Sequence, residues 1–327
     1  MVHGPVSDRT LYTQIIGFPR CKMSLNSVPI EEELRKNSAL TKADIDLLKS
    51  WCDEQFYSPN MSSSDLAIFL HSSYYYVERA KLNIMNYYIT RQSLPQFFKN
   101  RVMHLEQLTR QIFNAPAIIP LSKTTREGYK VILIRPFYVA QKNISSTNAI
   151  KYLNMVLDLN IYEEGTHEGY VFVVDLHGAN FFDPRSFNVT AVKAYFDYLQ
   201  KYVPIRWFGL HFVDTVFPLT AQNNRLTRMT IVQNDYVDAM YFHLDLDSLN
   251  EVVPLHVLPN EMGGQAGPLK DLHEDQLRKL RENWLWFLTM ESQEKSACMI
   301  RGVHEMKLFL KDLKTDIHGL GNVPFAV

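Results

Sequence analysis

The sequence predicts an α/β fold: a helical N-terminal domain, then a mixed, mainly parallel β-sheet flanked by helices, then further helices towards the C-terminal end. Two observations favour the sheet. Residues 170–176 are almost wholly apolar and β-branched, which is typical of a strand covered on both faces. Residues 189–203 then repeat apolar side chains at helical spacing, before Pro204 and another apolar strand at 207–213. The whole segment is a βαβ crossover, right-handed by default.

The N-terminal part contains helix signals but no strand signal. Residues 1–28 show no clear period, and we expect an irregular lead-in. The next run, IEEELRK, carries acids before bases, which matches the helix dipole. Thr41 with Asp44, and Ser63 or Ser64 with Asp65, can each begin a further helix. We therefore expect a helical domain over residues 29–100.

Strands and helices alternate further along the chain. Residues 130–138 form an apolar strand, and a helix opening at Thr147 leads to the strand at 170–176. The β-α-β-α-β order from 130 to 213 indicates a parallel or mixed sheet. Residues 101–127 are mixed and rich in turn residues. We place a second domain at 101–265 and a helical extension with a tail at 266–327.

Composition excludes some classes of partner and compartment. The 34 basic and 35 acidic residues leave no overall field for nucleic acid, so no nucleic-acid partner is expected. Cys21, Cys52 and Cys298 are too far apart for a disulfide framework or a zinc site. The N-terminus has no secretory apolar run, and no stretch is long enough to span a bilayer. A cytoplasmic protein with reduced thiols is expected.

Motifs for catalysis and cofactor binding are missing from the sequence. It has no G-x-S-x-G, no G-x-x-x-x-G-K-[ST] and no G-x-G-x-x-G, so no cofactor is expected. His304-Glu305 begins a zinc-binding pattern, but Leu308 stands where the second ligand belongs, so no metal site is expected. Asp175, His177 and His211 lie at strand ends without a visible base–nucleophile pair. The pattern favours binding over catalysis, and an enzyme ranks last.

Three segments together resemble the CRAL-TRIO family of lipid-transfer proteins, nearest to its tocopherol-transfer and retinaldehyde-binding branch. The first is SSDLAIFLHSSYYYVERAKLNIMNYY in the N-terminal helices. The second is VFVVDLHGANF with VPIRWFGLHFVD, and the third is LDLDSLNEVVPLHVLPNEMGG. With KVILIRPFY, the resemblance runs from about Leu40 to Gly264. It implies an apolar lipid cavity, closed by a mobile helical lid, in the α/β domain.

The resemblance also assigns candidate site residues. The helices at 147–158 and 189–203 would form cavity walls. The implied ligand contacts are apolar: Ile150, Leu153, Leu157, Val173, Phe196, Leu199, Leu210, Phe212 and Phe217. Plain core packing is the alternative for each of them. The implied phosphoinositide contacts are Arg206, Arg225 and Arg228, with solvated surface arginines as the alternative.

The sequence departs from the family in three places. His71 stands where the family has an arginine, and Phe208 replaces a second basic residue, which suggests altered head-group recognition. The segment expected to form the lid, residues 217–230, is unusually polar. Leu153 and Leu157 fall where some relatives have serines, which favours a more uniformly apolar ligand there.

Two functional hypotheses follow. The first is a carrier that transfers a hydrophobic small molecule between membranes: a tocopherol, retinoid, carotenoid or other isoprenoid, or a phospholipid. It would meet the membrane surface transiently, as a peripheral protein. The second is a phosphoinositide sensor or protein-interaction module without transfer activity. Its interface would be the helices at 270–315, with Trp284, Trp286, Phe287 and Met290 as anchors unless these pack in the core.

Overall fold

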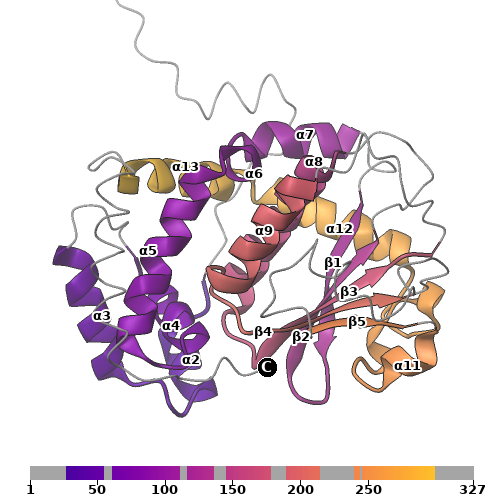
Figure 1. The fold of residues 1–327 in the computed structure, drawn as a ribbon, viewed down its shortest axis with the longest axis horizontal. Helices are drawn as coiled ribbons and strands as arrows, with labels where there is room; N and C mark the ends of the chain where they lie inside the picture. Colours follow the sequence, from indigo (N-terminus) through magenta and orange to yellow (C-terminus); the bar gives the residue numbers. More distant parts are fainter. Residues whose placement is uncertain are drawn as a thin grey trace, which may run out of the picture.

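The computed structural model describes residues 27–54, 61–110, 116–135, 145–177, 189–213, 239–243 and 245–298. Figure 1 shows helices from the N-terminal part at one end and the β-sheet at the other, with α8 (Ser146–Glu164) and α9 (Val189–Lys201) between them. The sheet has the strand order β1-β2-β3-β4-β5. The predicted fold class is confirmed: helices precede a mixed sheet, and further helices follow it.

The N-terminal helices begin where the sequence offers caps. The Ser62 side chain accepts from the Asp65 amide, and Asp65 accepts from the Ser62 amide, so α4 starts with a capping box. Thr41 and Asp44 form a similar arrangement ahead of α3. The helices of this part are α2 (Ile30–Lys36), α3 (Lys42–Glu54), α4 (Ser63–Ser72), α5 (Val77–Ser93), α6 (Pro95–Phe98) and α7 (Arg101–Arg110).

The sheet is parallel except at one edge. Strands β2 (Tyr129–Arg135), β3 (Gly169–Asp175), β4 (Trp207–Val213) and β5 (Met240–Phe242) pair in parallel. Strand β1 (Ala117–Thr124) pairs with β2 in the antiparallel sense. The sequence reading missed β1, within a segment described as mixed. Its Pro120 is tolerated because an edge strand needs ladder donors on one side only.

Each face of the sheet packs against a different set of elements. Ile132, Phe172 and Leu210 share a hydrophobic core with α8 and α9. Val131 and Val171 point the other way, into a second core. That second core also contains residues of α11 (Leu246–Asn250), η4 (Leu255–Val257), η5 (Asn260–Met262) and the start of α12 (Leu269–Glu282). The sheet is therefore covered on both faces, as its continuous apolar strands predict.

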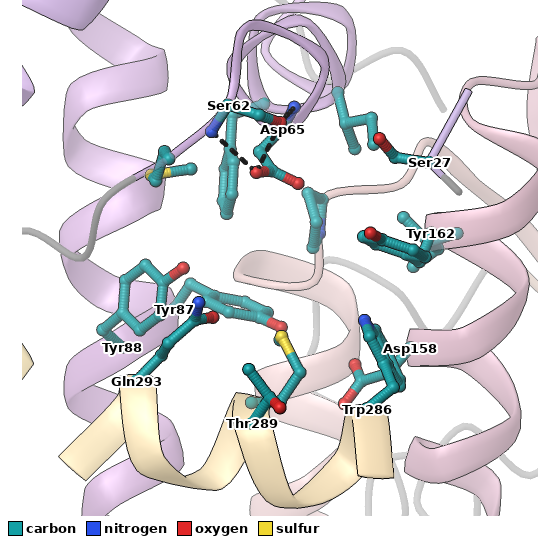
Figure 2. A pocket seen from close by; sticks show the side chains of 16 residues that line it. Ser27, Ser62, Asp65, Tyr87, Tyr88, Asp158, Tyr162, Trp286, Thr289 and Gln293 are labelled. Atoms are coloured by element: carbon teal, nitrogen blue, oxygen red, sulfur yellow. Dashed lines mark hydrogen bonds between the residues drawn. The ribbon is translucent and has the colours of Figure 1, made fainter. Parts of the chain in front are cut away.

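The C-terminal helices pack onto the N-terminal ones. Asn283 separates α12 from α13 (Trp284–Cys298). Trp284 is 1% exposed and Phe287 is fully buried. Core packing therefore accounts for these two aromatics, and neither is available as an interface anchor. Trp286 and Met290 line a pocket between α4, α5, α8 and α13 (Figure 2).

A buried ion cluster fastens α13 to the rest of the molecule. The two terminal guanidinium nitrogens of Arg91, Nη1 and Nη2, donate to Asp158 at 3.0 and 2.6 Å. Arg91 also lies 2.8 Å from Glu294, and Arg101 lies 3.0 Å from Asp158 and 3.3 Å from both Glu291 and Glu294. The cluster joins α5, α7, α8 and α13.

Among the described residues, no helix is long and apolar enough to cross a membrane.

Candidate apolar ligand site

Two apolar rows cross the sheet on the face that α8 and α9 cover. The inner row, Ile132–Phe172–Leu210–Met240, is almost completely buried, with exposures of 0, 1, 2 and 1%. The outer row, Ile134–Val174–Phe212–Phe242, lies two residues closer to the carboxyl ends of the strands. Within it, Val174 is 8% exposed and the other three are only partly buried. The exposure of the side chains therefore increases towards the carboxyl ends of the parallel strands.

The partly exposed side chains of the outer row continue onto α9. The rings of Phe212 and Phe242 stack with their centroids 5.1 Å apart and their planes at 10°. Val192 and Phe196 of α9 are also partly buried and pack against the same core. In open α/β sheets, ligands bind beyond the carboxyl ends of the parallel strands. The apolar surface lies where the fold usually places a ligand.

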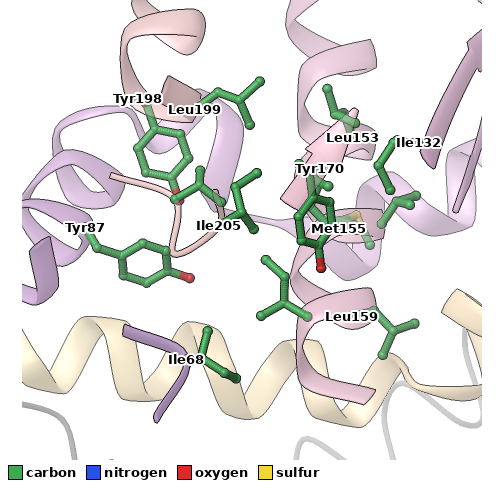
Figure 3. Close-up of a cluster of buried hydrophobic side chains, with 14 of the residues drawn as sticks. Ile68, Tyr87, Ile132, Leu153, Met155, Leu159, Tyr170, Tyr198, Leu199 and Ile205 are labelled. Carbon is green, nitrogen blue, oxygen red and sulfur yellow. The ribbon is translucent and has the colours of Figure 1, made fainter. Parts of the chain in front are cut away.

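The structure brings most of the predicted ligand contacts together. The following residues belong to, or pack against, one large hydrophobic core that the sheet, α8 and α9 share with the N-terminal and C-terminal helices: Ile150, Leu153, Leu157, Phe196, Leu199, Leu210 and Phe212. Figure 3 shows Leu153 and Leu199 within this cluster. Val173 is separated from them, because it points to the opposite face and into the second core. Phe217 and the segment expected to form the lid lie outside the described residues.

The same core contains polar atoms that the sequence reading did not single out. The hydroxyls of Tyr152 and Tyr195 are buried without a hydrogen-bond partner, and so are both amide atoms of Gln200. Burial raises the pKa of Tyr152 and of Tyr195, so both hydroxyls stay neutral. Each can donate one hydrogen bond to a ligand. Only their burial identifies them, since tyrosines are common along the chain.

The charged groups at the strand ends are paired with each other. Asp175 Oδ2 lies 3.2 Å from Arg135 Nε, and its Oδ1 accepts from the His177 amide at 3.0 Å. These contacts hold the carboxylate in an ion pair and a turn. Among the described residues, no group of three His, Cys, Asp or Glu side chains could hold a metal ion.

A pair of histidines joins β4 to α11. His211 Nδ1 lies 2.9 Å from His243 Nε2, and His243 Nδ1 lies 3.1 Å from the Ser248 hydroxyl. The His211 ring stacks on Tyr241 with a centroid distance of 4.6 Å. Burial, helped by His243, lowers the pKa of His211 to about 3. The neutral, buried ring of His211 therefore connects β4 to α11 through His243.

Arg206 contacts the N-terminal helices. Its Nε donates to the His71 carbonyl at 3.0 Å, and its guanidinium lies 4.4 Å from the Tyr74 ring centroid. Only 10% of the side chain is exposed, and Glu168 is 3.8 Å away. The guanidinium is thus engaged in docking β4 against α4. The other two predicted phosphoinositide contacts, Arg225 and Arg228, lie outside the described residues.

Comparison with known proteins identifies the domain that contains both apolar rows. Residues 114–264 match the model of the CRAL/TRIO domain. The chain contains a CRAL/TRIO domain. Residues 37–108, in the helices that precede the CRAL/TRIO domain, match the model named Pinta-like, UBA domain. The predicted family is therefore confirmed, and all four strands of the outer row belong to the CRAL/TRIO domain.

Three relatives of the CRAL/TRIO chain have the same printed name. The mouse alpha-tocopherol transfer protein-like protein is 25% identical over 242 residues, covering 73% of this chain and 69% of the relative. The human and Pongo abelii proteins of that name are 26% identical over 244 residues, with the same coverage. These matches confirm the predicted tocopherol-transfer-like branch and support a family of lipid-binding carriers.

Proposed function

We propose that this protein binds a hydrophobic small molecule in its CRAL/TRIO domain and transfers it between membranes. The candidate cargo is a tocopherol, a retinoid, a carotenoid or other isoprenoid, or a phospholipid. The observation that carries the proposal is the outer row, in which Ile134, Phe212 and Phe242 remain partly exposed beside a fully buried inner row. A monomeric protein rarely leaves adjoining apolar side chains uncovered without a use for them.

The predicted contacts define the wall against which the ligand would lie. Phe196 and Phe212 are only partly buried, whereas Leu153, Leu157 and Leu199 are buried in the same core. The apolar pair Leu153 and Leu157 supports a ligand whose body is uniformly apolar at that point. The neutral hydroxyls of Tyr152 and Tyr195 offer hydrogen bonds to a cargo that carries an oxygen atom.

A carrier of this kind solves a solubility problem. Each methylene group that leaves a membrane for water costs about 0.8 kcal/mol, so a long apolar molecule desorbs very slowly on its own. A dry apolar wall replaces the lipid surroundings at little cost. Release at the target requires the membrane to favour a more open state of the carrier. We therefore expect a transient, peripheral encounter with a membrane.

Phosphoinositide contact would come from arginines other than Arg206. Arg206 is engaged with His71 and Tyr74, which leaves Arg225 and Arg228 as the candidates for head-group binding. A pure sensor without cargo remains the competing function. It predicts binding to phosphoinositide vesicles together with an empty apolar core.

Organic extraction followed by mass spectrometry tests the proposal. The full chain is purified, extracted and compared with a mock purification. One enriched apolar compound at near-stoichiometric amount is the expected result. A second assay follows transfer of that compound from donor to acceptor vesicles, with and without phosphoinositide. A clean extract after incubation with mixed membranes would reject the carrier function and leave the sensor.

A further inference from the structure

A cavity lies apart from the predicted ligand contacts, and Ile68, Phe69 and Ile161 of the large hydrophobic core form part of its lining. Its volume is about 320 Å³, and it opens between α4, α5, α8 and α13 (Figure 2). The pocket joins the N-terminal helices to a helix that follows the CRAL/TRIO match. None of the predicted ligand contacts lines it. Its size is at the lower end of the range for small-molecule sites.

Aromatic rings form much of the lining. Tyr87 and Tyr88 enter from α5, Tyr162 from α8, and Trp286 from α13. Tyr162 and Trp286 are tilted against each other with centroids 5.0 Å apart. Arg91 already lies 4.8 Å from the Tyr87 ring centroid, so a cation–π contact exists at the edge of this group. Aromatic faces attract cations, most strongly where water is excluded.

The charge of the lining is negative. Asp65 and Asp158 contribute carboxylates, and none of the described residues that line the pocket is Lys, Arg or His. The Ser62 amide and hydroxyl both donate to Asp65 Oδ2, and Asp65 Oδ1 has no hydrogen-bond partner among the described residues. Asp158 belongs to the buried ion cluster, which has three carboxylates, its own included, and two guanidinium groups. An anionic ligand would therefore be repelled.

Free hydroxyls also face the cavity. Tyr87 is 6% exposed, and its hydroxyl makes no hydrogen bond to any described residue. The Tyr88 hydroxyl has no such bond either, and burial, together with Asp65 and Glu294, raises its pKa well above the usual range. A ligand with N–H groups could donate to both oxygens.

We propose that this pocket binds a small organic ammonium ion, such as an alkylammonium or a quaternary ammonium of the choline type. The aromatic faces of Tyr88, Tyr162 and Trp286 would enclose the cationic group. The free oxygen of Asp65 would neutralise its charge, and the hydroxyls of Tyr87 and Tyr88 would accept from any N–H. The site is separate from the cargo wall, so it is independent of the proposed transfer function.

Isothermal titration of the full chain tests this proposal. Choline, tetramethylammonium and butylammonium chlorides are titrated at constant ionic strength, with sodium chloride as the blank. We expect saturable binding of at least one cation. Asp65→Asn and Trp286→Leu should each weaken it about tenfold, which corresponds to about 1.4 kcal/mol and is within the range of a desolvated cation–π contact. Glycerophosphocholine distinguishes a lipid head group from a free amine as the source of the cation.

Asp271→Asn provides a matched control. Asp271, like Asp65, is an acid in the first turn of its helix, but it lies on α12 outside the pocket. Its substitution should change the dissociation constant less than twofold. Asparagine can still accept a hydrogen bond at position 65, and circular dichroism melts verify that each variant folds. Absence of saturable binding to the wild-type chain, or equal binding to Asp65→Asn and wild type, would overturn the proposal.

Discussion

The rings of Phe212 and Phe242 lie parallel, with centroids 5.1 Å apart and an interplanar angle of 10°. They are register partners on the neighbouring strands β4 and β5, so the stack continues the outer row from one strand to the next. Both rings remain partly exposed, whereas their inner-row neighbours Leu210 and Met240 are 2 and 1% exposed. This pair therefore offers the most direct test of the apolar wall.

Phe212→Ala should weaken retention of the hydrophobic cargo about tenfold, because it removes a ring from the wall; a tenfold loss is about 1.4 kcal/mol. The measurement is bound lipid per protein after purification. Val173→Ala is the control, since Val173 is fully buried on the opposite face. That variant should lose about 2 kcal/mol of stability and keep its cargo. Equal loss of cargo in both variants would contradict the assignment of the wall.

Tyr195 and Tyr198 form a matched pair on α9, each 1% exposed. The Tyr195 hydroxyl has no partner, whereas the Tyr198 hydroxyl accepts from Arg91 Nη1 at 3.0 Å. Tyr195→Phe should therefore stabilise the cargo-free protein by about 1 kcal/mol, because a buried unpaired group is removed. Tyr198→Phe should destabilise it by about 1.5–3 kcal/mol. Urea unfolding of the delipidated variants measures the change in unfolding free energy for each substitution. If both substitutions changed it in the same direction, the two hydroxyls would not differ in hydrogen bonding as described.

The ion cluster should be sensitive to loss of its central carboxylate. Asp158→Ala leaves Arg91 and Arg101 to share Glu294, and breaking a buried pair from one side costs about 3–5 kcal/mol. Asp53→Ala is the comparison, because the exposed pair of Asp53 with Lys49 spans 3.9 Å. We expect about 0–1 kcal/mol there. Denaturant midpoints would distinguish the two, and a mild effect of Asp158→Ala would argue against a cluster that stabilises the fold.

Stability should fall as the pH drops below about 6.5. Burial lowers the pKa of His71 to about 3, that of His104 to about 4 and that of His211 to about 3. The unfolded chain takes up protons near the ordinary histidine pKa of about 6.5, while the folded chain keeps these rings neutral. The unfolded state therefore binds more protons between pH 6.5 and 4, and acid favours it.

His104→Gln tests the size of this pH effect. Its ring Nε2 lies 3.1 Å from the Asn148 carbonyl oxygen, a contact that glutamine can partly replace. Loss of one proton-linked group should flatten the dependence of unfolding free energy on pH by up to about 1.4 kcal/mol per pH unit. Chemical unfolding between pH 7.5 and 4.5 gives the slope. An unchanged slope would mean that His104 titrates alike in both states.

Arg206→Ala separates docking from head-group binding. It removes the donor to His71 and the packing on Tyr74, so the melting temperature should fall. Because only 10% of the Arg206 side chain is exposed, sedimentation with phosphoinositide vesicles should change less than twofold. A large loss of vesicle binding with an unchanged melting temperature would instead establish Arg206 as a head-group contact.

The strongly periodic elements could be predicted from the sequence. The strand at 207–213 and the start of the helix at 189 agree with the prediction, because apolar periodicity, Pro204 and β-branched runs act together. Strand β1 was missed because Pro120 and the polar Ser122 and Lys123 interrupt its alternation. An edge strand tolerates such residues, and only the sheet as a whole shows that it is at an edge.

In a strand whose residues are all apolar, the sequence does not show which side chains point to which face of the sheet. All seven residues of β3 are buried, so no alternation indicates which ones point towards α8 and α9. For this reason the sequence could not show that Val173 points into the second core, away from the other predicted contacts. The ammonium pocket and the ion cluster depend on contacts between distant helices, and local patterns contain no signal for them. Arg91 and Glu294, for example, are separated by 203 positions.

That separation has a consequence during synthesis of the chain. A ribosome releases the N-terminal helices long before it has made α13, so Arg91 and Arg101 cannot pair with Glu294 until that residue has emerged from the ribosome. Until residue 294 has left the exit tunnel, the surface that Trp284 and Phe287 later cover stays open to water. We expect the half-made protein to depend on chaperones that shield this surface until α13 packs against it.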